Sequence, residues 1–211
     1  MSFATTFDDQ GRPVPVTLVP DGAWQQTDLA LLDFETGADS CANGTVAVNT
    51  TLRVRVPERQ LRGLQFTLGV PFDRNHADPL TAVAPLDDAA MHWHWRSGYK
   101  FLRAGVRSAD DGFWIHVGST ACKGTVQNIT GCDRPNRVTV SLPDFVPGFD
   151  TVVIDLSELL AETNLADGVR SDCSSGPAED SCAAPFDALG IEFGSGNDIG
   201  QQQVFKRRAG H

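Results

Sequence analysis

The chain has 211 residues and a mass of 22.7 kDa, a length typical of one domain. Its 17 Lys and Arg residues against 27 Asp and Glu residues give a formal net charge of −10, which disfavours binding to nucleic-acid phosphates or anionic lipid headgroups. Hydrophobic residues make up 41% of the chain, enough for a buried core, yet no apolar run approaches the ~20 residues of a membrane-spanning helix. We therefore expect residues 1–211 to form a single acidic domain.

Alternating apolar and polar residues predict strands, and the clearest alternation runs over Val46–Val56. Gly, Pro, Asp and Asn clusters separate the other expected strands, at residues 14–19, 29–34, 61–69, 100–106, 113–118, 137–142, 151–156 and 190–193. One short helix is expected after Asp155, which has capping-box spacing to Glu158. A second is expected from about Ser181 to Leu189, where Gly190 would end it. The fold class that follows is all-β: an antiparallel β-sandwich with two short helices and disulfide-stapled loops.

The five cysteines include two close pairs, each spanning a loop rich in small and polar residues. Such short loops suit disulfides, and the C-x-x-C spacing of thiolate metal sites is absent. The sequence thus predicts the bonds Cys122–Cys132 and Cys173–Cys182, which imply an oxidising compartment. Cys41 is left without a partner and is expected to be free.

The N-terminal residues Met1–Asp9 contain neither the basic nor the apolar region of a signal peptide. A missing preceding segment, carrying an export signal and a sixth cysteine, would explain both this and the unpaired Cys41. The alternative is a cytosolic protein with five reduced cysteines.

The most unusual segment is Met91–Phe101, which holds two of the four Trp, two of the five His and the only Tyr. If it is extended, His92 and His94 share one face and the indoles of Trp93 and Trp95 share the other. Two imidazoles about 7 Å apart on a strand can chelate a transition metal. We favour the simpler interpretation, in which these two His face solvent and the indoles belong to the core.

Two further histidines lie in more specific contexts. His76 sits in a loop that leaves a predicted strand, and His116 alternates with Ile115 and Val117 on another. Together they could form a metal site, although a strand histidine opposite the core could equally be exposed. The chain has no G-x-S-x-G, no Gly-rich phosphate loop and no H-E-x-x-H, so no enzyme class is indicated.

Taken together, these segments resemble the MbnP-like family, the W-x-W, four-Cys proteins of metallo-mystery pair systems. The resemblance keeps the same order along nearly the whole chain. The matching stretches are Gly22–Trp24, Leu29–Thr36, Cys41–Thr45, Asn49–Thr51, Gly63–Pro79, Met91–Arg103, His116–Cys122, Cys132–Arg137 and Cys173–Gly194.

The resemblance implies an exported, periplasmic or extracellular copper-binding protein that is not itself an enzyme. Its partner would be a di-haem, MbnH-type enzyme that oxidises a Trp to kynurenine. Two His and the kynurenine would then hold Cu(I), and the family pattern points to His76, His116 and either Trp93 or Trp95. We expect the indole of Trp114, close to His116 in sequence, to point away from a metal on His116.

The family also implies an upstream strand region with a further cysteine, in agreement with the missing segment inferred above. Two other functions remain open from the residues alone. Trp93, Trp95 and Trp114 could form an aromatic platform for carbohydrate or peptide on a β-sandwich binding module. A His-built metal centre could instead serve an enzyme, which would also need a carboxylate and an open coordination position.

Overall fold

The computed structural model describes residues 1–38, 44–57, 60–107, 112–165 and 172–210. Its longer strands are β1 (Ser2–Asp8), β5 (Leu61–Leu68), β7 (Gly98–Arg107), β8 (Gly112–Gly118), β9 (Thr120–Thr125), β10 (Asn128–Arg134) and β11 (Val138–Leu142). The shorter strands are β2 (Pro13–Pro15), β3 (Thr17–Leu18), β4 (Val54–Arg55), β6 (His92–His94), β12 (Thr151–Ile154) and β13 (Phe205–Arg208). The helices are α1 (Phe72–Asn75), α2 (Leu156–Leu160), a 3₁₀ helix at Asp180–Cys182 and α3 (Ala183–Leu189).

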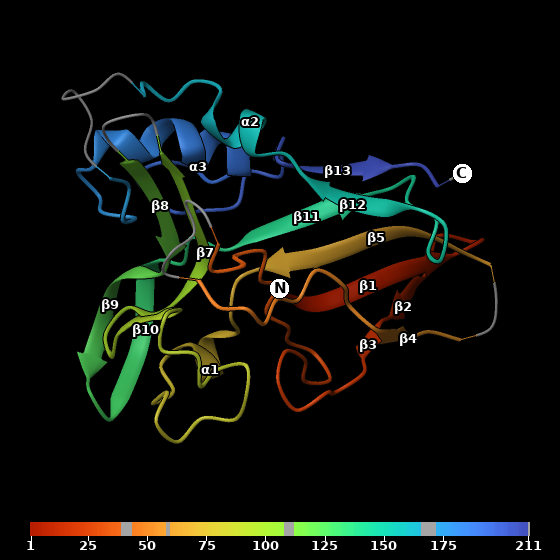
Figure 1. The fold of residues 1–211 in the computed structure, drawn as a ribbon, viewed down its shortest axis with the longest axis horizontal. Coiled ribbons are helices and arrows are strands. Elements are labelled where there is room, and N and C mark those ends of the chain that lie inside the picture. Colours follow the sequence, from red (N-terminus) through yellow and green to blue (C-terminus); the bar gives the residue numbers. More distant parts are fainter. Residues whose placement is uncertain (39–43, 58–59, 108–111, 166–171, 211) are drawn as a thin grey trace.

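A four-stranded antiparallel sheet in the order β11-β5-β1-β2 forms one side of the core (Figure 1). β5 is its central scaffold, with Val140 of β11 opposite Phe66 and both side chains buried. The Phe66 ring packs edge-on against Phe205 of β13, with centroids 5.4 Å apart, which joins the β12–β13 pair to this sheet.

A second sheet, in the order β6-β7-β8, carries the aromatic segment. On β8 the side chains of Phe113, Ile115 and Val117 are at most 2% exposed and belong to the core. Because strand residues alternate between faces, Trp114 and His116 lie on the opposite, outer face. The same alternation that builds the core thus presents a histidine beside an indole outside it.

Helices α2 and α3 lie above β7 and β8 in Figure 1, whereas α1 lies below these strands. Asp155 caps α2 by accepting hydrogen bonds from the backbone N–H groups of Ser157 and Glu158, as the sequence predicted. Gly190 ends α3 with φ 74°, a left-handed conformation that suits glycine. None of the helices among the described residues is long and apolar enough to cross a membrane.

The all-β antiparallel class is confirmed, with few and short helices. The expected disulfides Cys122–Cys132 and Cys173–Cys182 are both present. Cys41, expected to be free, lies outside the described residues. The strands expected at residues 61–69, 100–106, 113–118, 137–142 and 151–156 all form, with bounds shifted by a few residues.

The prediction of a long half-buried strand over Val46–Val56 is wrong. Only β4 forms there, and Val46 and Val48 are 94% and 39% exposed. β4 pairs with the two-residue β3, and Val54 and Val56 are also 44% and 36% exposed, so the described part of the chain leaves this apolar face largely uncovered. Residues 29–34 and 190–193, also expected as strands, contribute isolated bridges through Leu29, Ala30, Asp33 and Ile191.

Candidate metal centre

His116 on β8 lies against the indole of Trp93. The two rings meet edge to face, with centroids 5.9 Å apart and planes at 82°. Trp93 also covers Gly118, where a Cβ would come within 2.8 Å of the indole carbon Cζ3. Gly118 is two residues beyond His116 and so shares its face. The Trp93 indole therefore packs on two residues of β8, the His116 ring and the backbone of Gly118.

One ring nitrogen of His116 makes no hydrogen bond. Nε2 is buried and has no hydrogen-bond partner, a costly state for a polar atom that calls for an explanation. Burial lowers the pKa of His116, and the charges of Lys100 and Arg103 lower it further, against a smaller opposing effect of Asp172. The ring is therefore neutral near pH 7, the form in which an imidazole nitrogen binds metal.

The expectation that Trp114 points away from His116 is wrong. The two rings lie with centroids 6.1 Å apart and planes at 36°. These residues are two positions apart, so a strand places them on the same face. The guanidinium of Arg103 covers the indole at 5.5 Å from its centroid and is itself paired with Glu35. His116 is consequently flanked by two indoles.

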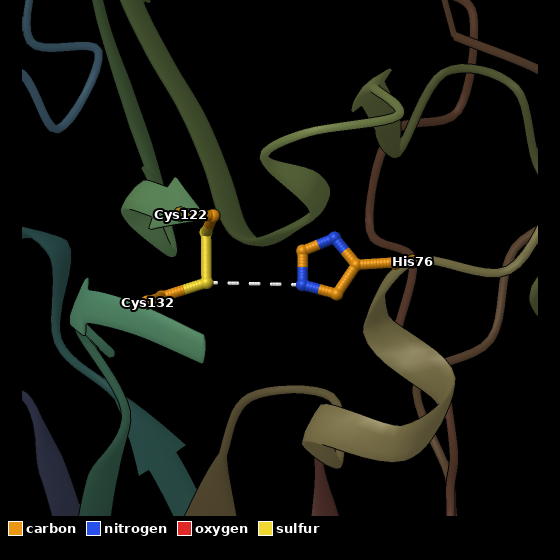
Figure 2. A group of neighbouring side chains, drawn as sticks. All are labelled: His76, Cys122 and Cys132. Atoms are coloured by element: carbon orange, nitrogen blue, oxygen red, sulfur yellow. Dashed lines mark hydrogen bonds between the residues drawn. A yellow bond between two sulfur atoms is a disulfide. The ribbon is translucent and has the colours of Figure 1, made fainter. Parts of the chain in front are cut away.

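His76 directly follows α1 and lies against a different part of the aromatic segment. Its Nδ1 is 3.2 Å from the backbone oxygen of Trp95, and Nε2 is 3.5 Å from Nδ2 of Asn75. Nε2 also lies 3.7 Å from the sulfur of Cys132 (Figure 2). Burial lowers the pKa of His76, and the hydrogen bond to Trp95 opposes that shift less strongly. This arrangement suits a neutral ring that donates from Nδ1 and carries its lone pair on Nε2.

One group of three potential metal ligands occurs among the described His, Cys, Asp and Glu side chains. It consists of His76, Cys122 and Cys132, with ligand atoms all within 4.8 Å of one another. Both cysteines are bonded to each other, and a disulfide lacks the thiolate that binds metal. In the oxidised protein, this cluster is therefore a disulfide packed against His76 and lacks the thiolates that a metal ion would need.

The W-x-W indoles do not act as a pair. β6 ends at His94 and is irregular in its pairing with β7, so Trp95 leaves the strand. Trp93 faces His116, whereas Trp95 is flanked by the exposed His94, at 5.3 Å between centroids, and by Arg96. His92 does not simply face solvent: its half-buried ring packs edge-on against Tyr99 at 5.1 Å.

Asn75 is a positioning residue that sequence reasoning missed. It is fully buried, its Nδ2 donates to the backbone oxygen of Ser97, and its Oδ1 accepts from the N–H of Tyr99. Gly98 approaches it so closely that a Cβ would lie 2.0 Å from the Asn75 backbone oxygen, and φ there is 78°. In the sequence, the available signals were the Asn75-His76 pair and the Ser97-Gly98 pair, which lie in different segments. The contacts of Asn75 join these two segments.

The structure thus brings both candidate histidines to the W-x-W segment, but at different points. His116 contacts Trp93, and His76 contacts the backbone of Trp95. For these described residues, no hydrogen bond or ring contact joins the two imidazoles to each other. Trp93, Trp95 and Trp114 are all half-buried rather than exposed in a row, unlike the aromatic platform considered above.

The family profile of MbnP matches residues 15–175, most of the chain. The chain belongs to the MbnP family. The structure is also similar to that of MbnP from Methylosinus trichosporium, with a TM-score of 0.79 and 25% sequence identity, over 99% of this chain and 84% of that one. A search of curated proteins gives no match. The resemblance seen in the sequence is therefore confirmed.

Proposed function

We propose that this MbnP-family protein binds copper outside the cytoplasm, with Cu(I) held by His116, His76 and a kynurenine made from Trp93. The observation that carries the proposal is the contact between Trp93 and His116, whose buried Nε2 has no other partner. Trp93 is preferred to Trp95 because the ring of Trp95 contacts neither histidine candidate. His76 is the second imidazole because it adjoins the same segment.

An unmodified indole cannot fill the third position. Its nitrogen carries a hydrogen and donates only, so Trp is a poor metal ligand. Oxidative opening cleaves the C2–C3 bond, releases C2 as formate and leaves an aryl amine and a ketone, a net loss of one carbon and gain of one oxygen. The four oxidising equivalents would come from two molecules of peroxide activated at the haem of a di-haem, MbnH-type partner, and water would hydrolyse the formyl group from the ring nitrogen. The amine could then bind copper beside His116.

Few, soft or borderline ligands suit Cu(I) and disfavour Mg²⁺ and Ca²⁺. In this scheme the protein is the substrate of its partner and catalyses no reaction of its own. Two disulfides support a place in the periplasm or outside the cell, since such bonds persist in oxidising compartments.

The test compares protein made alone with protein made together with its di-haem partner. Tandem mass spectrometry of the co-produced protein should locate the loss of carbon and gain of oxygen on Trp93, with near-ultraviolet absorbance from the aryl ketone. Modification of Trp114, which also flanks His116, or of Trp24 or Trp95 would contradict the assignment, as would intact Trp beside an active partner.

Cu(I) affinities of histidine variants show which histidines are ligands. In the modified protein, His116→Ala and His76→Ala should each weaken Cu(I) binding at least about tenfold, as loss of even an outer-shell partner does. His94→Ala is the matched control, because His94 is exposed on the same segment. If His94→Ala lost as much Cu(I) affinity as His116→Ala, the copper site would have to include His94 on β6.

A further inference from the structure

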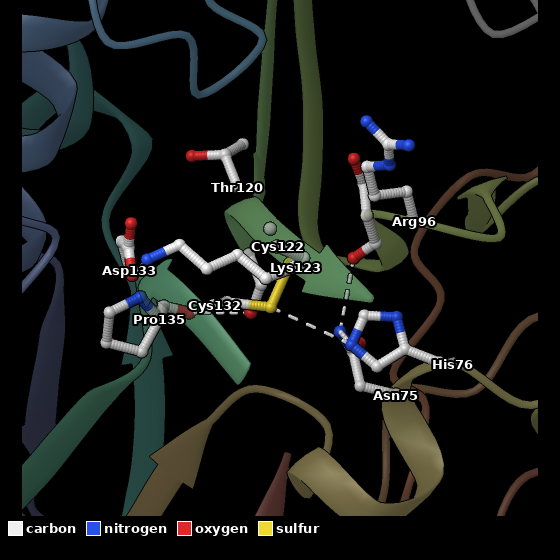
Figure 3. Close-up of a disulfide and its surroundings, with 12 residues drawn as sticks. Asn75, His76, Arg96, Thr120, Cys122, Lys123, Cys132, Asp133 and Pro135 are labelled. Carbon is white, nitrogen blue, oxygen red and sulfur yellow. Dashed lines mark hydrogen bonds and ion pairs between the residues drawn. A yellow bond between two sulfur atoms is a disulfide. The ribbon is translucent and has the colours of Figure 1, made fainter. Parts of the chain in front are cut away.

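The corner formed by His76 and the hairpin β9–β10 holds a disulfide that the proposed copper site does not use, although His76 itself is a ligand in that proposal as well. Cys122 and Cys132 lie directly opposite each other in this two-stranded antiparallel ladder. The sulfur of Cys132 is the atom that Nε2 of His76 faces (Figures 2 and 3). We propose that reduction of this disulfide creates a site for a thiophilic metal ion of the Zn²⁺ or Cu⁺ class, bound by the two thiolates and His76 Nε2.

The spacing of the ligand atoms fits such a site. With metal–sulfur and metal–nitrogen bonds of about 2.3 and 2.05 Å at a tetrahedral angle, the nitrogen and sulfur lie about 3.6 Å apart. The Cys132 sulfur and His76 Nε2 are already 3.7 Å apart. Once the S–S bond is broken, the second sulfur needs only to move away from the first to reach the same spacing.

The third ligand is held in place by other contacts. Nδ1 of His76 faces the backbone oxygen of Trp95 at 3.2 Å, so the hydrogen of the neutral ring is engaged there and Nε2 keeps its lone pair. A hydrogen bond from the far nitrogen to a backbone carbonyl is the usual way in which a metal-binding histidine is oriented. The donor set of two thiolates and one imidazole selects soft and borderline metals.

The hairpin should survive loss of the disulfide. Its register is also held by backbone pairs on both sides of the cysteines, including Arg134 with Thr120 and Asn128 with Thr125, and by the ion pair of Lys123 and Asp133. β9 and β10 pair only with each other among the described strands, so the main sheets do not depend on this bond. The two thiols would therefore stay opposite each other.

This disulfide is also the more accessible of the two. Cys132 is half-buried, whereas Cys173 and Cys182 are both 0% exposed. A dithiol reductant, such as a protein of the thioredoxin class or dithiothreitol, would attack the Cys132 sulfur through a mixed disulfide and leave as its own disulfide. Two cysteine thiols result, and binding of a divalent metal releases two protons to the solvent.

The test uses the 211-residue chain made without the partner enzyme, in a Cys41→Ser background that removes the cysteine outside the two disulfides. The protein is treated with dithiothreitol, desalted without oxygen and titrated with Co²⁺, a spectroscopic substitute for Zn²⁺. Reduced protein should bind one Co²⁺ per chain with sulfur-to-cobalt charge-transfer absorbance in the near ultraviolet. The oxidised protein should show no such band, and Zn²⁺ should displace the Co²⁺.

Two variants test the ligands. His76→Ala should weaken Co²⁺ binding at least about tenfold, and Cys122→Ser/Cys132→Ser should abolish the charge-transfer band while the other disulfide remains. His76 is a ligand in both proposals, so His116→Ala is the variant that separates them: it should leave the Co²⁺ band unchanged while weakening Cu(I) binding in the modified protein.

Three results would overturn the proposal. One is a reduced protein that binds no more Co²⁺ than the oxidised protein. Another is a charge-transfer band that survives in Cys122→Ser/Cys132→Ser, or a Co²⁺ affinity that is unchanged in His76→Ala. The last is loss of the native near-ultraviolet circular dichroism on reduction alone, because the site needs the intact hairpin register.

Discussion

A single methyl group added at Gly118 should displace Trp93 from His116. Gly118 lies buried at the end of β8 opposite Lys100, and its Cβ would meet Cζ3 of Trp93 and the backbone oxygen of Tyr99, both at 2.8 Å. Ordinary van der Waals contacts begin near 3.4 Å. Gly118→Ala therefore requires the indole to move by more than half an ångström, and the contact with the backbone oxygen of Tyr99 must relax as well.

Overpacking of this kind typically costs about 1–3 kcal/mol in the free energy of unfolding. For a domain of this size each kcal/mol lowers the melting temperature by about 2–4 °C. The matched control is Gly112→Ala on the same strand, where the nearest atom to the new Cβ is 3.6 Å away. We expect Gly112→Ala to change the unfolding free energy by no more than about 0.5 kcal/mol.

Urea unfolding followed by circular dichroism measures both variants, alone and combined with Trp93→Ala. Removing the indole should recover a measurable part of the cost of Gly118→Ala, and the contact with Tyr99 should account for the remainder. If Gly118→Ala costs no more than Gly112→Ala, or costs the same with and without the Trp93 ring, the packing of Trp93 on β8 is not as described.

Two further predictions test the supports of the site and the fold. Asn75→Ala should lower the unfolding free energy by about 1–3 kcal/mol, because it removes the hydrogen bonds to the half-buried backbone oxygen of Ser97 and the buried N–H of Tyr99. It should also reduce kynurenine formation, measured by mass spectrometry. Asn128→Ala, at an exposed position, is its control, and equal effects of the two variants would refute the role of Asn75. Hydrogen bonds from Ser157 and Lys206 hold the pKa of Asp155 well below its usual range, so its contribution is present above about pH 4 and lost as the pH falls further. Asp155→Asn should therefore show a shallower loss of stability in acid, and an unchanged slope would contradict this.

The core strands could be predicted because their alternation reflects burial on one face. On β8, Phe113, Ile115 and Val117 point inward and are almost fully buried, so pattern and structure agree. The same pattern over Val46–Val56 failed because alternation shows only that one face is apolar. Whether another layer covers that face depends on contacts far away in sequence.

β1 was missed for the opposite reason. Its inward positions include Ser2, Thr6 and Asp8, while Phe3 is 51% exposed. The buried hydroxyls are satisfied across the sheet, Ser2 by the backbone oxygen of Gly69 and Thr6 by that of Gly63. Polar residues with such partners can be buried without great cost, and no local pattern reveals partners more than fifty residues away.

In the candidate site, too, contacts within one strand could be predicted from the sequence and contacts between strands could not. Strand periodicity applied correctly would have paired Trp114 with His116, since two positions separate them on β8. The contact of Trp93 with His116 could not be derived in this way, because the indole reaches over the intervening strand β7. The resemblance to the MbnP family supplied the residue set, and the tertiary structure distinguishes Trp93 from Trp95 by their contacts.

The charges around His116 bear on the copper oxidation state that such a site would favour. Lys100 lies over the Trp93 ring at 6.0 Å and Arg103 over Trp114 at 5.5 Å, and both act on the His116 ring. The carboxylate of Asp172 opposes them less strongly and accepts a hydrogen bond from the backbone N–H of Trp114. Coulomb repulsion from fixed cations grows in proportion to the charge of the bound ion, so it penalises Cu²⁺ about twice as much as Cu⁺. In the proposed site, where an aryl amine would lie beside this imidazole, Lys100 and Arg103 would favour the monovalent ion, and Glu35, which pairs with Arg103, would weaken that preference.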